Sequence, residues 1–230
     1  MIADPGRPYG GDMRVHVVSD VHGRADALLG AAHGADALIC LGDLLLFLDY
    51  ADYGQGIFAD LFGAEAARVY VELRAARRFD EARELSARLF AQKTEAPARL
   101  FEAAITRQYA ELFGALPEPA YLTYGNVDVP RMWERHIKPG HHVVDGGTVE
   151  LGGWTFGFVG GGLKSAYRTP NEMTEEEFRA KLEAIRATRP RYSIFGHVHQ
   201  PLARRTRIGV TECLNVGHFR ATGAPFVLQW

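Results

Sequence analysis

Short apolar runs alternate with amphipathic stretches from Arg14 onward, and this pattern predicts parallel βαβ units. The run RVHVVS is followed by the helical pattern ADALLGAAH and then by a second apolar run, DALICLG. Apolar side chains recur at three- or four-residue spacings through residues 57–115, which predicts a block of helices, and Pro97 is expected to open the last of them. We therefore expect an α/β core with a helical insertion at about 57–115. The insertion is long for a connection between strands, so it either caps a functional site or packs as a layer on the sheet edge.

The second half of the chain is rich in predicted strands. AYLTYGN has a strand pattern, and residues 141–162 predict a meander of short strands separated by glycine pairs. Thr174 and Glu177 have the spacing of a capping box that opens a helix. Four strand-like segments close the chain: RYSIFGH, PLARRTR, VTECLNVG and PFVLQ. Because the start of the chain is rich in Pro and Gly, we expect a flexible extension at 1–12 before a single domain at 13–230.

Composition and charge exclude several classes of protein. The 230 residues, 47% of them hydrophobic, can bury one sizeable core, and the net charge of -2 gives no field that favours nucleic acid or an anionic membrane. The sequence shows no basic groove with interleaved aromatic residues, so specific nucleic-acid binding is not predicted. The run LICLGDLLLFL is shorter than the roughly 20 residues of a membrane span. Cys40 and Cys213 lack CxxC spacing, and no signal peptide is recognisable, so we expect a cytoplasmic protein, bacterial by its Ala- and Arg-rich composition.

Polar clusters follow four of the strand-like runs, and these clusters are the main chemical signal in the chain. The carboxyl ends of strands in an open α/β sheet border the crevice in which ligands bind, so the clusters can converge. Residues two apart in an extended backbone point to the same side, so each DxH or HxH pair could present two ligands to one place. The clusters are Asp20-Val-His22, Asp43, Asn126-Val-Asp128 and His197-Val-His199.

The donor types in these clusters suit a divalent metal such as Mn, Fe or Zn. Carboxylate, amide oxygen and imidazole together favour these borderline ions, and the lack of cysteine argues against a closed structural zinc site. A carboxylate between two histidine pairs could bridge two ions. We choose Asp43 for this role because Gly42 before it lets the backbone turn tightly.

The same motifs resemble those of the calcineurin-like metallophosphoesterases, which read DxH, GD, GN and GHxH in this order. The match runs from Asp20 to His199, and 215–217 is similar to the closing turn of the smaller bacterial members. The resemblance implies a two-sheet sandwich flanked by helices (α/β/β/α) and two divalent metal ions that activate a water against a phosphoester substrate. It implies one metal on Asp20, His22, Asp43 and His199, and the other on Asp43, Asn126 and His197. Asp43, Asn126 and Asp128 are the candidate catalytic residues, and Asn126 would also contact the substrate.

The chain departs from the family pattern at Val127, where many members carry a histidine that protonates the leaving group. Loss of such a group typically costs on the order of 10²- to 10⁴-fold. The small bacterial phosphodiesterase branch also lacks this histidine and keeps the following Asp, as GNVD does here. The prediction is therefore a phosphodiesterase more than a monoesterase.

A second departure concerns the second metal. Family members place a further strand, ending in a histidine ligand, between the glycine-rich turn at 160–162 and the GHxH motif. Here TEEEFRAKLEAIRATRP leads directly into RYSIFGHVH. Either this metal has one protein ligand fewer, or a segment of the natural chain is missing between Phe178 and Arg189, where a Cα–Cα step well above about 3.8 Å would reveal it.

Several further residues have two interpretations each. Asp128 either orients a neighbour or is an ordinary turn residue, and His218 either replaces the absent ligand and contacts substrate or is a surface histidine. The glycines at 160–162, with Gly161 at their centre, form either a phosphate-binding nest with Lys164 or a tight strand-to-loop turn. The alternative to an enzyme is a non-catalytic interaction scaffold on the same fold. The sequence carries no signal for an oligomeric state.

Overall fold

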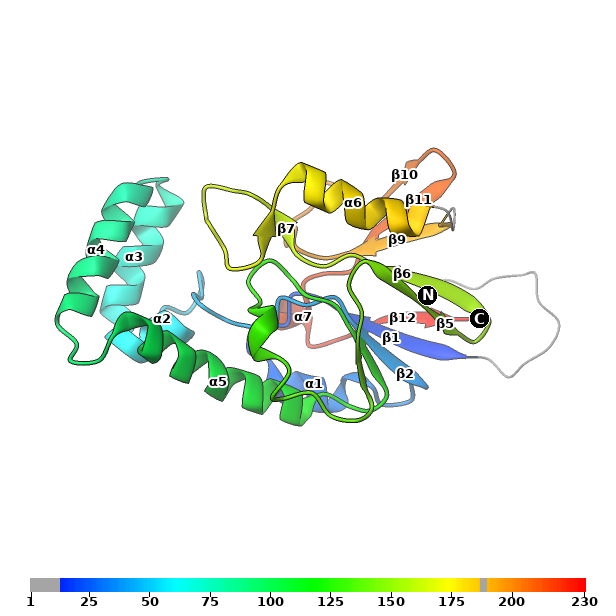
Figure 1. Ribbon diagram of the computed structural model, residues 1–230, viewed down its shortest axis with the longest axis horizontal. Coiled ribbons are helices and arrows are strands. Elements are labelled where there is room, and N and C mark those ends of the chain that lie inside the picture. The colour runs from blue at the N-terminus through cyan, green and yellow to red at the C-terminus, as the bar shows by residue number, and fades with distance from the viewer. Residues whose placement is uncertain (1–12, 187–189) are drawn as a thin grey trace.

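The computed structural model describes residues 13–186 and 190–230, so the extension predicted at 1–12 lies outside the described residues. Its largest sheet has five strands in the order β12-β1-β2-β3-β4, with β1 to β4 parallel and β12 antiparallel to β1 (Figure 1). The predicted mixed α/β class is confirmed. The strands of this sheet are β1 (Arg14–Val18), β2 (Ala37–Cys40), β3 (Ala120–Leu122), β4 (His141–Val143) and β12 (Phe226–Gln229).

Two helices cover one face of this main sheet. They are α1 (Ala25–Ala31), which connects β1 to β2, and α5 (Pro97–Ala115), which begins at the predicted proline. Each large apolar side chain buried here contributes about 1.5–3 kcal/mol, so the cluster fixes α5 firmly to the sheet. Its largest members include Leu28, Leu38, Tyr109, Phe113 and Leu122, each at most 1% exposed.

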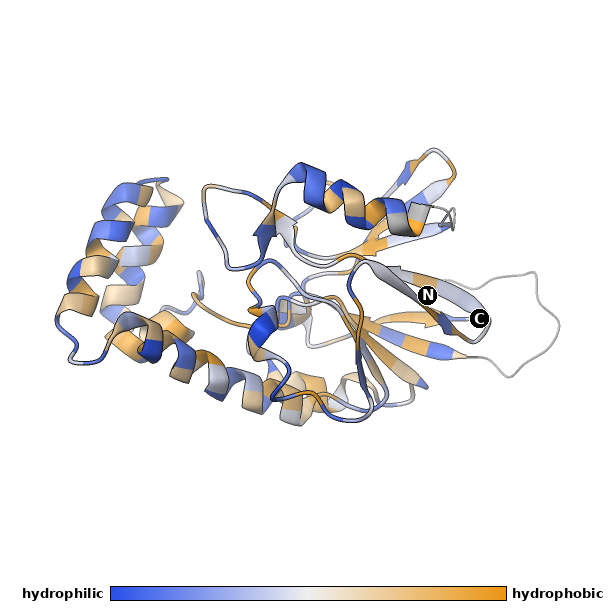
Figure 2. Cartoon of the chain, in the orientation of Figure 1, coloured by the Kyte–Doolittle hydropathy of each residue, from blue (hydrophilic) through white to orange (hydrophobic). Residues whose placement is uncertain are grey.

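The rest of the insertion forms a helical arm, defined here as residues 57–91. It contains α2 (Ile57–Phe62), α3 (Ala64–Ala75) and α4 (Phe79–Ala91), and Figure 1 shows α3 and α4 side by side, away from the sheets. The arm has a small apolar cluster of its own around Phe58, while much of its surface is hydrophilic (Figure 2). The insertion therefore combines a layer on the sheet with a projecting arm, and neither predicted arrangement alone describes it.

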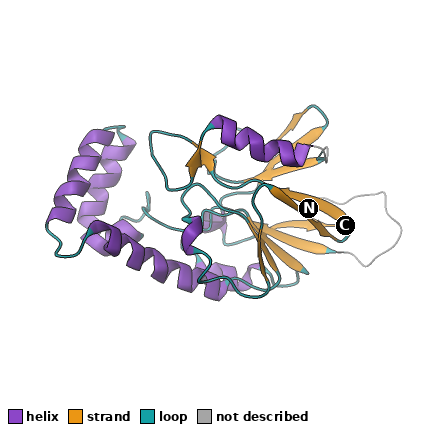
Figure 3. Cartoon of the chain, viewed as in Figure 1, coloured by secondary structure: helices purple, strands orange, loops and turns teal. Residues whose placement is uncertain are grey.

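Three smaller sheets form in the second half of the chain (Figure 3). Alternate residues of β1 and β2 face the helices on one side and a second apolar cluster on the other, as expected for strands buried on both faces. This second cluster joins the main sheet to β6 and β9. The strands are the hairpin β5 (Gly147–Leu151) and β6 (Trp154–Phe158), the pair β7 (Gly162–Leu163) and β8 (Glu172–Met173), and the sheet of β9 (Tyr192–Phe195), β10 (Arg205–Ile208) and β11 (Thr211–Asn215).

Helix α6 (Glu175–Arg186) opens with the predicted capping box. The backbone N–H of Glu177 donates to Thr174 Oγ1 at 3.2 Å, and the N–H of Thr174 donates to Glu177 Oε2 at 2.7 Å. Two very short helices, α7 (Phe219–Thr222) and a 3₁₀ turn at Pro130–Met132, were not predicted because neither is long enough to show a helical period. Within the described chain, no helix has the length and apolar character to cross a membrane.

A cavity of about 2360 Å³ is lined by β6, β9 and part of the helical arm. Among the described strands, β6 pairs only with β5 and β9 only with β11, so each has a free edge. Along the described chain between β6 and β9 lie β7, β8 and α6, and neither of these two strands ends in a histidine. Helix α6 runs without a break to Arg186, and the remaining junction at 187–189 lies outside the described residues.

Candidate metal centre

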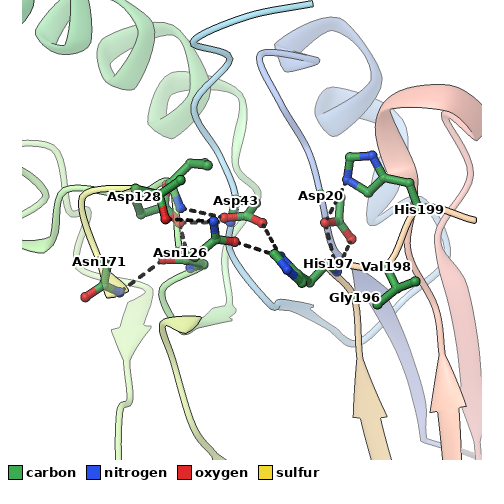
Figure 4. Close-up of polar contacts among 12 residues, drawn as sticks. Asp20, Asp43, Asn126, Asp128, Asn171, Gly196, His197, Val198 and His199 are labelled. Carbon is green, nitrogen blue, oxygen red and sulfur yellow. Dashed lines mark hydrogen bonds and ion pairs between the residues drawn. The ribbon is translucent and has the colours of Figure 1, made fainter. Parts of the chain in front are cut away.

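The polar clusters predicted from the sequence follow strands β1, β2, β3 and β9, and the structure brings them together. Figure 4 shows side chains from all four segments directed into one region, with Asp43 drawn between Asn126 and Asp20. The segments that contain Asp20 and His197 are joined directly, because the backbone N–H of His197 donates to both carboxylate oxygens of Asp20 at 2.9 Å. The predicted convergence of segments distant in sequence is therefore present.

Asp20, His22 and His199 form the first cluster. One potential ligand atom from each lies within 4.8 Å of the others, and Asp20 Oδ1 is 3.2 Å from His199 Nε2. Nδ1 of His22 lies 2.9 Å from the carbonyl oxygen of Leu45. Because a carbonyl can only accept, Nδ1 carries the proton and Nε2 keeps a lone pair for a cation.

The ionisation of Asp20 also suits a cation site. Burial of this carboxyl, which is 0% exposed, acts to raise its pKa. The hydrogen bond with His199, and then the interactions with His22 and the backbone N–H of His197, together outweigh burial, so the pKa of Asp20 lies below its usual value. Asp20 is therefore anionic at neutral pH.

Asp43, Asn126 and His197 form the second cluster. Nδ1 of His197 is 2.8 Å from Asn126 Oδ1 and 3.9 Å from Asp43 Oδ2. The other oxygen of Asp43 accepts the N–H of Val127 at 2.9 Å, which fixes the carboxylate plane. The nearby carboxylate of Asp43 raises the pKa of His197. Oxygen and imidazole donors thus converge here, as divalent metals of the Mn, Fe and Zn type require.

The backbone at these residues is strained. A φ between about +40° and +70° lies in the left-handed region, which residues other than glycine seldom occupy. The φ values are 56° at Asp20, 42° at His22, 51° at Asp43 and 68° at His197, and in the described chain only Arg77 and Arg168 share this property among non-glycine residues. The expectation that DxH and HxH pairs converge through extended backbone is wrong, since left-handed turns bring these side chains together. Such strain gathers at functional sites.

Glycines allow the ligand segments to approach one another closely. A Cβ atom added at Gly196 or at Gly217 would lie 2.3 Å from Asp20 Oδ2. One added at Gly125 would lie 2.1 Å from Asp43 Oδ1, and one at Gly42 would lie 2.0 Å from the nitrogen of Gly125. Each carboxylate therefore lies against backbone that only glycine allows to come so close, and the neighbouring segments are shaped around these two side chains.

Asp128 lies beneath the second cluster and is completely buried. Its Oδ2 accepts the N–H groups of Asp43 and Gly125 at 2.9 and 2.8 Å, and its Oδ1 accepts that of Leu44 at 3.0 Å. Burial, and then the charge of Asp43, raise the pKa of Asp128. With these contacts Asp128 is a positioning residue that joins the loop after β2 to the loop after β3, the first of its two predicted roles.

The prediction of a phosphate-binding nest at 160–162 is wrong. All three N–H groups donate to protein acceptors: Gly160 to Asp145 Oδ1, Gly161 to the Tyr124 carbonyl and Gly162 to the Asn171 carbonyl, at 2.7–3.1 Å. The glycines permit a close approach, because a Cβ at Gly160 would lie 2.9 Å from Tyr124 backbone atoms. Lys164 is exposed and does not line the cavity.

His218 belongs to the first cluster. Its ring stacks on that of His199, with centroids 3.8 Å apart and planes inclined by 11°. Burial and the neighbouring His199 and His22 lower the pKa of His218 to about 4. This histidine is therefore a neutral part of the centre, where sequence position alone made a surface histidine the simpler interpretation.

Two further residues at the centre were not singled out from the sequence. Thr169 accepts a hydrogen bond from Asn126 Nδ2 at 3.0 Å. Arg220 donates to the carbonyl of His22 at 2.7 Å and forms an ion pair with Asp49. Both lie outside the strand-end clusters, so no pattern in the chain marked them.

The fold and site define a mixed α/β protein with a candidate metal centre at the ends of its strands. No family model matches the chain, and no curated protein matches it. Among solved structures, the chain is similar to the crystal structure of TT1561 of Thermus thermophilus, with a TM-score of 0.50 and 12% sequence identity. The likeness covers 95% of this chain and 98% of that one, so it concerns the fold over nearly its whole length.

Proposed function

We propose that the protein is a metal-dependent phosphoesterase of the calcineurin-like metallophosphoesterase family, with a preference for phosphodiesters over small phosphomonoesters. The observation that carries this proposal is the convergence of two clusters, each with carboxylate and imidazole donors, on strained and glycine-cradled backbone. Polar residues that only cap turns need neither feature. The family's two-sheet sandwich is part of the proposal, and apolar packing on both faces of the main sheet supports it.

In this proposal one divalent cation is held by Asp20, His22 and His199, the other by Asn126 and His197, and Asp43 is shared. The donor chemistry and the lone pair on His22 Nε2 fit such ions. When bound, the cations would supply Lewis acidity toward phosphate oxygens and lower the pKa of an attacking water.

The residues of the chain itself determine which esters react well. The amide of Asn126 is oriented, since Nδ2 donates to Thr169 and Oδ1 faces His197. Val127 has no proton to give to a leaving group. A good leaving group needs no such proton, so we expect diesters with stable leaving groups to react best.

The test combines metal content with turnover of bis(p-nitrophenyl) phosphate in added manganese. Wild-type protein should bind close to two metal ions per chain and hydrolyse the diester. Asp43→Asn should lose activity by at least about 100-fold, which corresponds to about 2.7 kcal/mol of transition-state stabilisation. Asp52→Asn, in an exposed turn, is the matched control and should retain full activity. Wild-type protein that binds no manganese and shows no turnover would contradict the proposal.

That negative result would favour a non-catalytic interaction scaffold. Exposed apolar side chains around β10 support this second candidate, because contiguous apolar surface is typical of interaction sites. Leu202, Ile208 and Val210 are 109%, 71% and 84% exposed, respectively.

A further inference from the structure

The helical arm closes against the loop at 163–171 that leads from β7 to β8. The rings of Phe79, at the start of α4, and Tyr167 in the loop meet edge to face with centroids 5.4 Å apart. Both residues line the large cavity, and so do the candidate ligands His22, Asp43 and His199. The arm and loop therefore border the same space as the candidate metal centre.

Arg74 of α3 lines this cavity and contacts three tyrosines. Its guanidinium lies 5.7 Å from the ring centroid of Tyr70 and 5.0 Å from that of Tyr167, and Nε donates to the hydroxyl of Tyr50 at 3.4 Å. Within the described residues, no carboxylate forms an ion pair with it. No described carboxylate therefore neutralises the partly buried charge of Arg74.

Other arginines of the arm differ in this respect. Arg68 on α3, Arg83 on α4 and Arg78 just before α4 each pair with a carboxylate three or four residues away. Arg88 is exposed on α4 and does not line the cavity. Only at Arg74 do aromatic faces, partial burial and the cavity coincide.

The geometry of this cation suits an anionic ligand. Rings that lie against the faces of a guanidinium leave its N–H edge available, and that edge matches phosphate and carboxylate oxygens. The hydroxyls of Tyr50 and Tyr70 can occupy only two of the five N–H donors of Arg74. The surrounding rings also offer stacking surface to a flat group on the same ligand.

The loop connects this cation to the metal centre. Tyr167 is two residues from Thr169, whose hydroxyl accepts from Asn126 at 3.0 Å. Two residues of chain, with the side chains of Tyr167 and Thr169 at their ends, place the guanidinium of Arg74 at most about 22 Å from the amide of Asn126. An elongated substrate could therefore contact both.

On this basis, and given the proposed phosphoesterase activity, we propose that Arg74, framed by Tyr50, Tyr70 and Tyr167, binds a second anionic group of an elongated aromatic phosphodiester. Arg74 and the three tyrosines then determine specificity at a distance from the reacting phosphate. Compact diesters do not reach them.

The test uses p-nitrophenyl esters of thymidine 5′-phosphate, of thymidine 3′,5′-bisphosphate and of the dinucleotide pTpTp. As the substrate is lengthened along this series, kcat/KM should rise at the length that reaches Arg74. Arg74→Gln should abolish that rise, which is a loss in kcat/KM of about 10- to 100-fold for one charged hydrogen bond. The variant should keep wild-type turnover of bis(p-nitrophenyl) phosphate. Arg88→Gln removes the same charge from the arm and should leave the whole series unchanged.

Binding measured without turnover separates this inference from the proposed function. Calorimetric titration of metal-free protein with unlabelled pTpTp should show affinity reduced about 10-fold or more by Arg74→Gln. Tyr167→Leu, a substitution in the loop that leaves the arm's own apolar cluster intact, should weaken binding in the same direction. Unchanged binding in both variants would overturn the inference even if the enzyme is active. A protein inactive on every diester, yet with Arg74-dependent binding, would instead overturn only the phosphoesterase proposal.

Discussion

Replacing Asp128 with alanine tests whether the candidate centre depends on one buried carboxyl. Its two oxygens accept the backbone N–H groups of Asp43, Leu44 and Gly125, and they join two loops that are far apart in sequence. The side chain is 0% exposed, so these donors have no direct access to bulk water. Asp128→Ala would leave all three N–H groups without their acceptor.

The expected loss of stability follows from these contacts. Each buried donor left unsatisfied costs about 1–3 kcal/mol. Two effects reduce the total, because a water can enter the space left by the carboxyl and because removing a buried carboxyl, whose pKa is raised by burial, relieves desolvation. We therefore expect Asp128→Ala to lower the free energy of unfolding by about 3–5 kcal/mol, a large share of the roughly 5–15 kcal/mol that folded domains have.

Urea unfolding of metal-free protein, followed by tryptophan fluorescence, measures this loss. Asp128→Asn keeps one acceptor oxygen and should fall between wild type and Asp128→Ala. Asp52→Ala is the control, because Asp52 also accepts hydrogen bonds, from Gly54 and Gln55, but in an exposed turn where water can replace it. It should cost less than about 1 kcal/mol. An Asp128→Ala protein within about 1 kcal/mol of wild type would refute the positioning role.

Two further predictions concern a glycine and an ion pair. Gly196→Ala should lower manganese affinity about 10-fold or more, because the added Cβ would lie 2.3 Å from Asp20 Oδ2. Calorimetry measures this affinity. Gly30→Ala is the control, since its Cβ would meet no atom within 4 Å, and it should leave the affinity unchanged. Asp49→Asn should lower unfolding free energy at pH 7 by about 1–3 kcal/mol, because the Arg220 pair and two backbone N–H groups hold the pKa of Asp49 below its usual value despite burial. The difference from wild type should shrink as pH falls from about 4, the pKa of this carboxyl in the unfolded chain, through its lower pKa in the folded protein; a difference that is unchanged at about pH 2 would contradict this.

The elements with a clear period were predictable from the sequence. The buried runs of β1 and β2, the helix beginning at Pro97 and the capping box at Thr174 each have a local signature, and each is present. The division of the insertion into a sheet layer and an arm was not predictable. It depends on which apolar faces find partners in the folded molecule, such as the contact between Phe79 and Tyr167.

The candidate ligands were predictable as a set because each cluster follows a strand. The clusters after β1, β2 and β3 lie at neighbouring strand ends of the main sheet, whereas His197 and His199 follow β9 of a separate sheet. The contacts that orient the candidate ligands were not predictable, since Thr169, Arg220 and the stacked His218 reach the centre through loops without periodicity. Glycines were ambiguous for a related reason. Glycine allows close approach of two backbone segments, as at Gly196, and it is also the residue that a phosphate nest needs. At 160–162 these two roles are distinguished only by the protein acceptors that the N–H groups find in the folded molecule.

At the centre, residues that carry a side chain adopt a backbone conformation that favours glycine. A left-handed conformation costs a non-glycine residue roughly 1–2 kcal/mol, and Asp20, His22, Asp43 and His197 all adopt it. Glycine at any of these positions would remove that cost but also the donor atom. The fold instead offsets the strain with bonds to the same segments, such as those from Asp43 and Leu44 to Asp128 and from Arg220 to the His22 carbonyl. Strain of this kind persists where the surrounding structure holds a side chain in a position that its backbone disfavours, as the ligand set proposed for this centre would require.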